Sequence, residues 1–213
     1  MIPRRPLADL IAASDRAWVT TKQLLSEARN PVVVHERDAE RCERVLERLQ
    51  LGTDSTIGAL VYETGGLSFD YGWLRFPAGG SEGVPIDLSH EWSSADQLFV
   101  VAYDAVGGFF AVNRGKFPGK VGRVWYLAPD TLEWEDTAEG YCDLLYWAVT
   151  GDLDDYYANA RWPGWEQEVQ ALPGDRAFSF YPPLYTQEGK DPAKCSRRAV
   201  PVTELWSLHS SGF

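Results

Sequence analysis

Apolar residues recur at helical spacing in the first third of the chain. The stripe in residues 38–50 is the clearest, because charged residues separate its members, which are Ala39, Cys42, Val45, Leu46 and Leu49. This spacing predicts an amphipathic helix. Residues 15–29 and about 53–65 repeat the pattern, and each stretch ends at residues where helices commonly stop. A short apolar piece at 32–34 fits an edge strand.

From Leu67 onward the period changes from 3.6 to 2, and we expect strands up to about residue 135. The predicted strands are 67–76, 97–104, 108–114 and 121–128, with a short extension at 132–135. A glycine doublet precedes the first strand, and a second doublet, Gly107-Gly108, fits a hairpin turn between two apolar runs. The long connection 77–96 is the best candidate for a functional loop.

The last third of the chain returns to mixed patterns. We expect helices over about 140–153 and 152–160, and another that begins near Pro163. A strand in 177–185 is stopped by two prolines. The polar tract 187–199 is predicted to be a loop, and a short helical turn follows it.

Length and composition suit one domain that covers 1–213. The chain has 213 residues, of which 45% are hydrophobic and 13% aromatic, enough for a well-packed core. Cys42, Cys142 and Cys195 are odd in number and widely spaced, which favours reduced thiols over a disulfide framework. No signal-peptide pattern is present, and no run approaches the roughly 20 apolar residues of a membrane span. We therefore expect a cytoplasmic protein with no membrane partner.

The charge balance narrows the class of partner. There are 31 acidic and 20 basic residues, for a formal net charge of −11. Such a charge favours solubility, repels nucleic-acid phosphates and attracts basic surfaces. The composition therefore disfavours nucleic-acid binding and is compatible with a basic protein partner.

Residues typical of catalysis do not form a recognised motif. His35, His90 and His209 lie far apart without another ligand at metal-binding spacing, and solvated positions account for the last two. No nucleophile-elbow pattern occurs, and the glycine-rich segments match neither phosphate-loop pattern. We therefore predict no catalytic residue, no metal site and no cofactor, and a protein that is not an enzyme.

Two groups of carboxylates are the remaining candidates for chemistry. Glu133 and Glu135, two apart on a strand, would share a face and could raise one another's pKa, although a solvated face explains them equally well. Asp152, Asp154 and Asp155 fall in the first turn of a predicted helix, where the helix dipole favours them.

Several motifs carry a resemblance to known families. The segments YETGG, DYGWLR, DAVGGFFAVN, YLAPDTLEWE, RWPGWEQEV and FSFYPPL resemble a bacterial family of unknown function over nearly the whole chain. Over roughly 42–153 the order of elements is also similar to the SUKH superfamily, named for Smi/Knr-like and Syd-like proteins. That resemblance implies an α+β fold with a mostly antiparallel sheet and flanking helices, a core of about 38–153 and an extension over 154–213. Many members are immunity proteins that neutralise polymorphic toxins, so the resemblance implies no catalytic residues.

Three functional hypotheses follow, of which the third is a housekeeping structural partner with no toxin. The first is a protein-binding module, such as an immunity protein whose acidic surface covers a basic toxin. Its candidate contact residues are Asp70, Trp92, Glu133, Glu135, Asp152, Asp154 and Asp155. The alternative is a small-ligand binder or enzyme with a pocket under the 77–96 loop, lined by Tyr71, Trp73 and Trp92.

Overall fold

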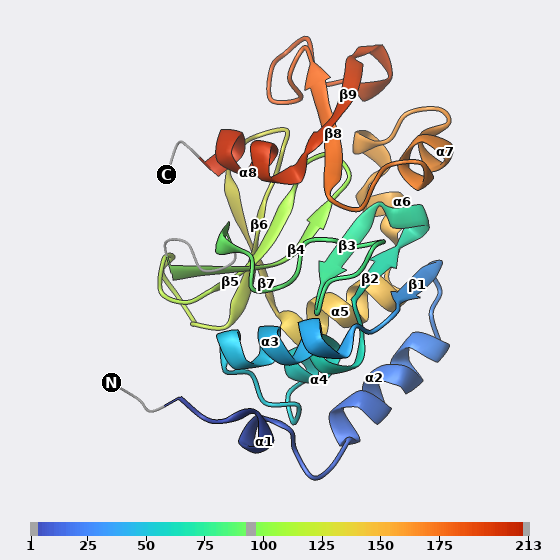
Figure 1. Ribbon diagram of the computed structural model, residues 1–213. Helices are drawn as coiled ribbons and strands as arrows, with labels where there is room; N and C mark the ends of the chain where they lie inside the picture. Colours follow the sequence, from blue (N-terminus) through green and yellow to red (C-terminus); the bar gives the residue numbers. More distant parts are fainter. Residues whose placement is uncertain (1–3, 93–96, 211–213) are drawn as a thin grey trace.

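The computed structural model describes residues 4–92 and 97–210 of the chain (Figure 1). Its centre is a seven-stranded sheet in which β1 to β7 lie in chain order and neighbouring strands are antiparallel. A smaller sheet pairs β8 with β9. The strands are β1 (Val32–His35), β2 (Gly66–Phe69), β3 (Leu74–Pro77), β4 (Leu98–Asp104), β5 (Phe109–Asn113), β6 (Arg123–Leu127), β7 (Trp134–Gly140), β8 (Arg176–Tyr181) and β9 (Ser196–Pro201). The predicted α+β class with a mostly antiparallel sheet and flanking helices is confirmed.

The helices follow the apolar stripes closely. They are α1 (Leu7–Leu10), α2 (Arg16–Ser26), α3 (Ala39–Leu49), α4 (Thr56–Glu63), α5 (Tyr141–Thr150), α6 (Leu153–Tyr156), α7 (Trp165–Gln170) and α8 (Val202–Ser210). Asp38 and Ser55 cap α3 and α4, since each side chain accepts a backbone N–H of the first turn. In the part of the chain that the structure describes, no helix is both long and apolar enough to cross a membrane.

Three predicted segments differ from the structure, and one of them, 132–135, is replaced by the longer β7. The run 67–76 is a hairpin of β2 and β3 rather than one strand. The chain reverses through Asp70, Tyr71 and Gly72, whose φ angles are 52°, 58° and 92°. The tract 187–199 is not entirely loop, because its last residues belong to β9, a strand with mostly exposed side chains.

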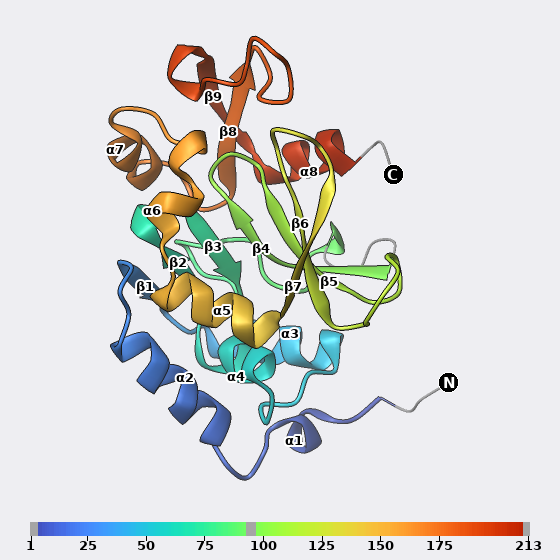
Figure 2. The same cartoon turned by 180° about the vertical axis from the view of Figure 1, so that it is seen from behind.

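The sheet separates two apolar clusters. Phe99 and Val101 of β4 belong to the cluster that includes residues of α3, α4 and α5. Val100 and Tyr103 of the same strand belong to a second cluster, which includes residues of β9 and α8. Figures 1 and 2 accordingly show α2 to α5 on the opposite side of the molecule from α8 and the β8–β9 hairpin. Both faces of the central strands are therefore covered.

The long connection after β3 packs onto this core. Ala78, Val84 and Leu88 are buried, and residues 93–96 of the connection lie outside the described residues. The expected division into a core of about 38–153 and an extension of 154–213 stays a prediction. Trp162 and Leu172 of the extension nevertheless share an apolar cluster with the central sheet.

Candidate functional site

The turn between β4 and β5 is built around the carboxyl group of Asp104, which is fully buried. Its Oδ1 accepts the backbone N–H groups of Val106 and Gly108, at 3.0 and 2.7 Å. Its Oδ2 accepts the hydroxyl of Tyr126 at 2.8 Å. Aspartate favours such turns because its side chain bonds backbone N–H groups a few residues on. Burial raises the pKa of Asp104, and these hydrogen bonds oppose the change.

Gly108 leaves the space that the Asp104–Tyr126 pair fills. A Cβ at this position would lie 2.3 Å from both Asp104 Oδ2 and Tyr126 Oη. We expect Gly108→Ala to lower the free energy of unfolding by about 1–3 kcal/mol, as overpacking does in a core. Urea denaturation measures this change. Gly140→Ala is the control, since its Cβ would meet nothing closer than 3.4 Å. Equal losses in the two variants would contradict the explanation.

The C-terminal segment holds the same turn. The backbone N–H of Phe178 in β8 donates to the carbonyl of Ala105 at 2.7 Å. His209 Nδ1 in α8 lies 2.9 Å from the carbonyl oxygen of Gly107, and because a carbonyl only accepts, Nδ1 carries the proton. The prediction of a solvated His209 is wrong, since the residue is 7% exposed and burial lowers its pKa.

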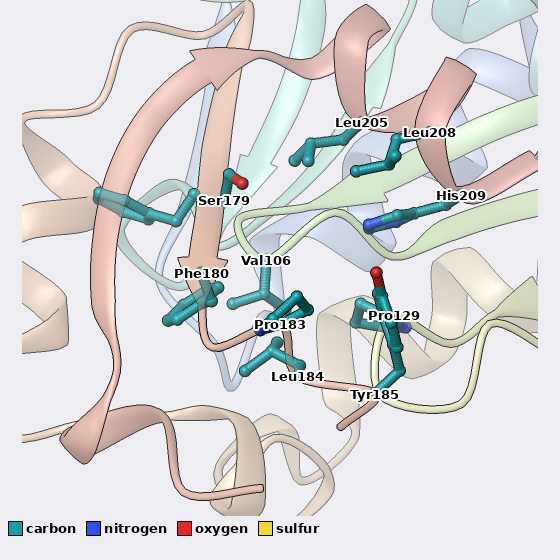
Figure 3. Close-up of a pocket in the computed structure, with 11 residues that line it drawn as sticks. Val106, Pro129, Ser179, Phe180, Pro183, Leu184, Tyr185, Leu205, Leu208 and His209 are labelled. Carbon is teal, nitrogen blue, oxygen red and sulfur yellow. The ribbon is translucent and has the colours of Figure 1, made fainter. Parts of the chain in front are cut away.

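A small hollow lies beside this contact, with Tyr185 and His209 entering it from opposite sides (Figure 3). Its volume is about 60 Å³. A buried water needs roughly 10–15 Å³, so the hollow has room for a few waters and is too small for a metabolite. It shares Pro129, Leu184 and Tyr185 with a larger neighbour.

Two larger hollows adjoin along the ring of Tyr126. Their volumes are about 480 and 680 Å³, and Tyr126, Glu135 and Tyr156 line both. The first hollow lies between β6 and β7 and the helices α5 and α6, which face the viewer in Figure 2. The second continues from there to residues 184–192. We refer to the two hollows together as the acidic groove.

Carboxylates surround the first hollow of the acidic groove. They are Glu135, Asp136, Glu139 and Asp143, and no described lysine or arginine lines this hollow. Asp136 pairs with Arg123 at 2.9 Å, and Asp143 accepts a backbone N–H at the start of α5. Glu135 and Glu139 make no ion pair with a described residue. The first hollow therefore faces uncompensated negative charge.

Tyrosines form the floor and mouth of the groove. Tyr126 and Tyr157 are 7% and 2% exposed, whereas Tyr156 is 46% exposed. The hydroxyl of Tyr157 is buried and has no hydrogen-bond partner among the described residues, which typically costs about 1–3 kcal/mol. Burial raises the pKa of all three tyrosines, and the nearby Asp104 carboxyl adds to this effect. Their hydroxyl groups therefore stay neutral at physiological pH.

The structure separates the two glutamates that the sequence pairs. Glu135 lines both hollows. Glu133 is exposed but lines neither, because β7 covers Trp134–Gly140 rather than 132–135 and Glu133 precedes it. Of these two glutamates, only Glu135 therefore lines the groove.

The three aspartates at the start of α6 are exposed but line neither hollow. Asp152 caps α6 and lies 3.5 Å from Arg29. Asp154 accepts a hydrogen bond from Arg161 at 2.5 Å, while Asp155 forms no ion pair with a described residue. These aspartates border the groove without forming its wall.

Asp70 and Trp92 lie in the interior, unlike the exposed contacts that the sequence suggested. Asp70 is 6% exposed and forms an ion pair with Arg161. Trp92 is 3% exposed and packs against Tyr103 and Phe109. Neither side chain is presented to a partner in this structure.

The aromatic residues expected to line a pocket under the 77–96 loop do not come together. Trp73 and Trp92 are buried in different apolar clusters. A hollow of about 470 Å³ does lie beside the connection, and Tyr71, Arg75 and Glu82 are in its wall. In residues 4–92 and 97–210, no group of three His, Cys, Asp or Glu side chains is placed to hold a metal ion.

One sequence signal could have pointed to the acidic groove. Residues 124–160 contain no lysine or arginine, yet they include Asp130, Glu133, Glu135, Asp136, Glu139, Asp143, Asp152, Asp154 and Asp155. The same stretch carries Tyr126, Tyr146, Tyr156 and Tyr157, whereas Tyr185 of the second hollow lies outside it. Tyr126 and Trp147 were missed as site residues because their positions suited the core of a strand and a helix.

Comparisons with known proteins agree on the family. Residues 7–205 match the family model described as "Protein of unknown function DUF2625". A "Putative uncharacterized protein YbfG" of Escherichia coli K12 is 36% identical over 209 residues, or 96% of this chain and 95% of the relative. An "Uncharacterized protein" of Haemophilus influenzae is 33% identical over 187 residues, or 84% of this chain and 82% of the relative. No solved structure matches. The chain therefore belongs to the bacterial family described as "Protein of unknown function DUF2625".

Proposed function

We propose that this protein is a cytoplasmic binding module whose acidic groove receives a basic partner protein. The observation that carries the proposal is the wall of the first hollow, which has four carboxylates and no described basic residue. Complementary charge speeds association and excludes wrong partners. Tyr146 and Tyr156, which also line this hollow, are 59% and 46% exposed, and tyrosine is enriched among residues that dominate binding energy.

Within this binding function, the specific role that we propose is immunity against a polymorphic toxin. The resemblance to the SUKH superfamily supports it, as does the acidic character of the groove. Glu135 would make the central contact, and Glu133, Asp152, Asp154 and Asp155 would supply negative charge at the border. An acidic surface of this kind would cover the basic substrate site of a nuclease toxin and keep nucleic acid out of it. The proposed role is binding rather than catalysis.

The test begins with capture of the tagged protein's partner from its host and continues with purified components. The key variant is Glu135→Lys with Glu139→Lys, because neither carboxylate forms an ion pair with a residue that the structure describes. We expect at least a tenfold weaker affinity, mainly through slower association, and a weaker salt dependence of the association rate. Surface plasmon resonance at two salt concentrations measures both.

The matched control reverses two acidic residues that do not line the groove, Asp9→Lys with Glu47→Lys. It changes the net charge by the same amount, so a difference between the two double variants reports the position of the charges and not the net charge of the protein. We expect its affinity to stay within about threefold of wild type, as for charges outside an interface. Equal losses of affinity in both double variants would show that the acidic groove is not the binding surface.

A small-ligand role at the hollow beside residues 77–92 is the second candidate. Arg75 in its wall is 3% exposed and donates to the carbonyls of Leu172 and Arg176, at 3.2 and 2.7 Å. No described carboxylate forms an ion pair with it, so its charge favours an anionic ligand. A protein that elutes alone from host extract at low and high salt would favour this candidate over a protein partner.

A further inference from the structure

The border between the two hollows of the acidic groove has the composition of a site for an organic cation. Tyr126, Glu135 and Tyr156 belong to both hollows. The rings of Tyr126 and Tyr156 meet at 62°, with centroids 6.2 Å apart. Trp147 stands at 74° to Tyr156, with centroids 4.9 Å apart. Rings at such angles pack edge to face, and the 46% exposure of Tyr156 leaves part of its ring open to the groove, where an aromatic face attracts cations.

The unpaired carboxylate of Glu135 adds a formal charge at the same border. A weakly hydrated alkylammonium group suits this mixture of rings and carboxylate better than a metal ion, which would require several oxygen ligands together. Phe110 continues the apolar wall, stacked on Tyr126 with centroids 4.4 Å apart. A hydrocarbon chain attached to the cation could therefore lie along the first hollow.

The ring of Tyr157 extends the aromatic wall of the second hollow. Tyr157 lines the second hollow and packs against Tyr156, with ring centroids 4.8 Å apart. Its Oη has no hydrogen-bond partner among the described residues. Buried polar atoms without a partner are uncommon, and this one places an unsatisfied oxygen next to the ring of Tyr156.

We infer that the border formed by Tyr126, Glu135 and Tyr156 binds the ammonium group of a lysine side chain presented by the basic partner. This inference rests on the proposed function and names the chemical group that the acidic groove selects. The lysine carbon chain lies against Phe110 and Trp147. A partner protein is favoured over a free polyamine because Tyr146 and Tyr156 are largely exposed around the groove and offer contact area that a small ligand would leave uncovered.

The inference is tested with short peptides in an NMR titration of the purified full-length protein. The probes are an alanine peptide with one central lysine, the same peptide with norleucine, and spermidine. We expect saturable binding of the lysine peptide and at least tenfold weaker binding of the norleucine peptide. We expect Glu135→Gln and Tyr156→Leu each to weaken lysine binding about tenfold, whereas Tyr156→Phe keeps the ring and restores most of it. Glu47→Gln is the control outside the groove.

Each alternative result has a separate meaning. Equal binding of the lysine and norleucine peptides would overturn the cation site. If spermidine binds more tightly than the lysine peptide, the ligand of this site is a free polyamine and not a lysine of a partner protein. If the lysine peptide fails to bind while a captured partner still depends on Glu135 and Glu139, the lysine inference fails and the proposed function stands. If neither binds through the groove, both fail.

Discussion

Replacing Asp104 with alanine is expected to lower the free energy of unfolding by about 3–5 kcal/mol, near the upper limit for a single substitution. The carboxyl group is 0% exposed and accepts three hydrogen bonds, from Val106, Gly108 and Tyr126. Alanine leaves all three donors without this partner inside the protein, and each unsatisfied buried group costs about 1–3 kcal/mol. Chemical denaturation at neutral pH measures the loss.

Asparagine at the same position is the matched comparison. Its amide oxygen can accept both backbone N–H groups, and its amide nitrogen can donate to the Tyr126 hydroxyl, which also accepts. We therefore expect Asp104→Asn to cost about 1–3 kcal/mol, less than alanine, since both backbone hydrogen bonds are kept and only the Tyr126 hydroxyl hydrogen loses its acceptor. A loss as large as that of alanine would show that the negative charge itself holds the turn.

The pH dependence of the unfolding free energy shows whether the carboxyl group of Asp104 is charged or neutral in the folded protein. Because burial raises the pKa of Asp104, the folded protein keeps its proton at pH values where the unfolded chain, with a pKa of 3.8, has released it. The stability contributed by this group is fully present below that value and is lost as pH rises through the folded pKa. The unfolding free energy of wild type minus that of Asp104→Asn should therefore fall as pH rises across this window. A difference that increased with pH would contradict the raised pKa.

The sequence predicts elements well where one face of an element is buried and the other is solvated. The stripe in 38–50 predicts α3 to within a residue at each end, because its charged residues leave only one face for the core. The strands β2 and β3 lack this contrast between a buried and a solvated face. Both are buried throughout, and their apolar run continues across the turn. The reversal at 70–72 uses two left-handed residues other than glycine, and Tyr71 is not a residue type that favours this conformation.

The candidate site could be predicted only in part for a related reason. Glu135 is visible in the sequence as an acidic residue of a predicted strand, but its neighbours in the first hollow come from four other elements, β5, β6, α5 and α6. Tyr126 lies on β6, Trp147 on α5 and Tyr156 on α6, and their side chains look like ordinary core residues in sequence. Their convergence depends on how α5 and α6 pack beside β6 and β7, which no local pattern specifies.

The ion pair between Asp70 and Arg161 is where we expect the second large loss of stability. Asp70 opens the left-handed turn between β2 and β3, and Arg161 is 91 residues away. Their side chains are 8% and 7% exposed, and the guanidinium group also lies 3.9 Å from the ring centroid of Trp165. Arg161→Met keeps much of the packing but leaves a buried carboxylate unpaired, which should lower the free energy of unfolding by about 3–5 kcal/mol.

A double-mutant cycle identifies the cause of this loss. Asp70→Asn suits the φ angle of 52°, because asparagine is enriched among left-handed residues, and it removes the charge. Asp70→Asn with Arg161→Met should therefore be more stable than Arg161→Met alone. Arg29→Met is the control, since its pair with Asp152 is exposed and should contribute about 0–1 kcal/mol.

Acid should partly rescue the single variant. Burial raises the pKa of Asp70, and Arg161 opposes that rise in the wild-type protein. Without Arg161 the pKa of Asp70 rises further, so the folded variant gains stability as pH falls toward that value, where the carboxyl becomes neutral. Urea denaturation at pH 7 and pH 5 should show a smaller deficit for Arg161→Met at pH 5. A deficit that stays constant with pH, and that Asp70→Asn does not reduce, would mean that Arg161 stabilises the protein through its aromatic contacts rather than by neutralising the turn between β2 and β3.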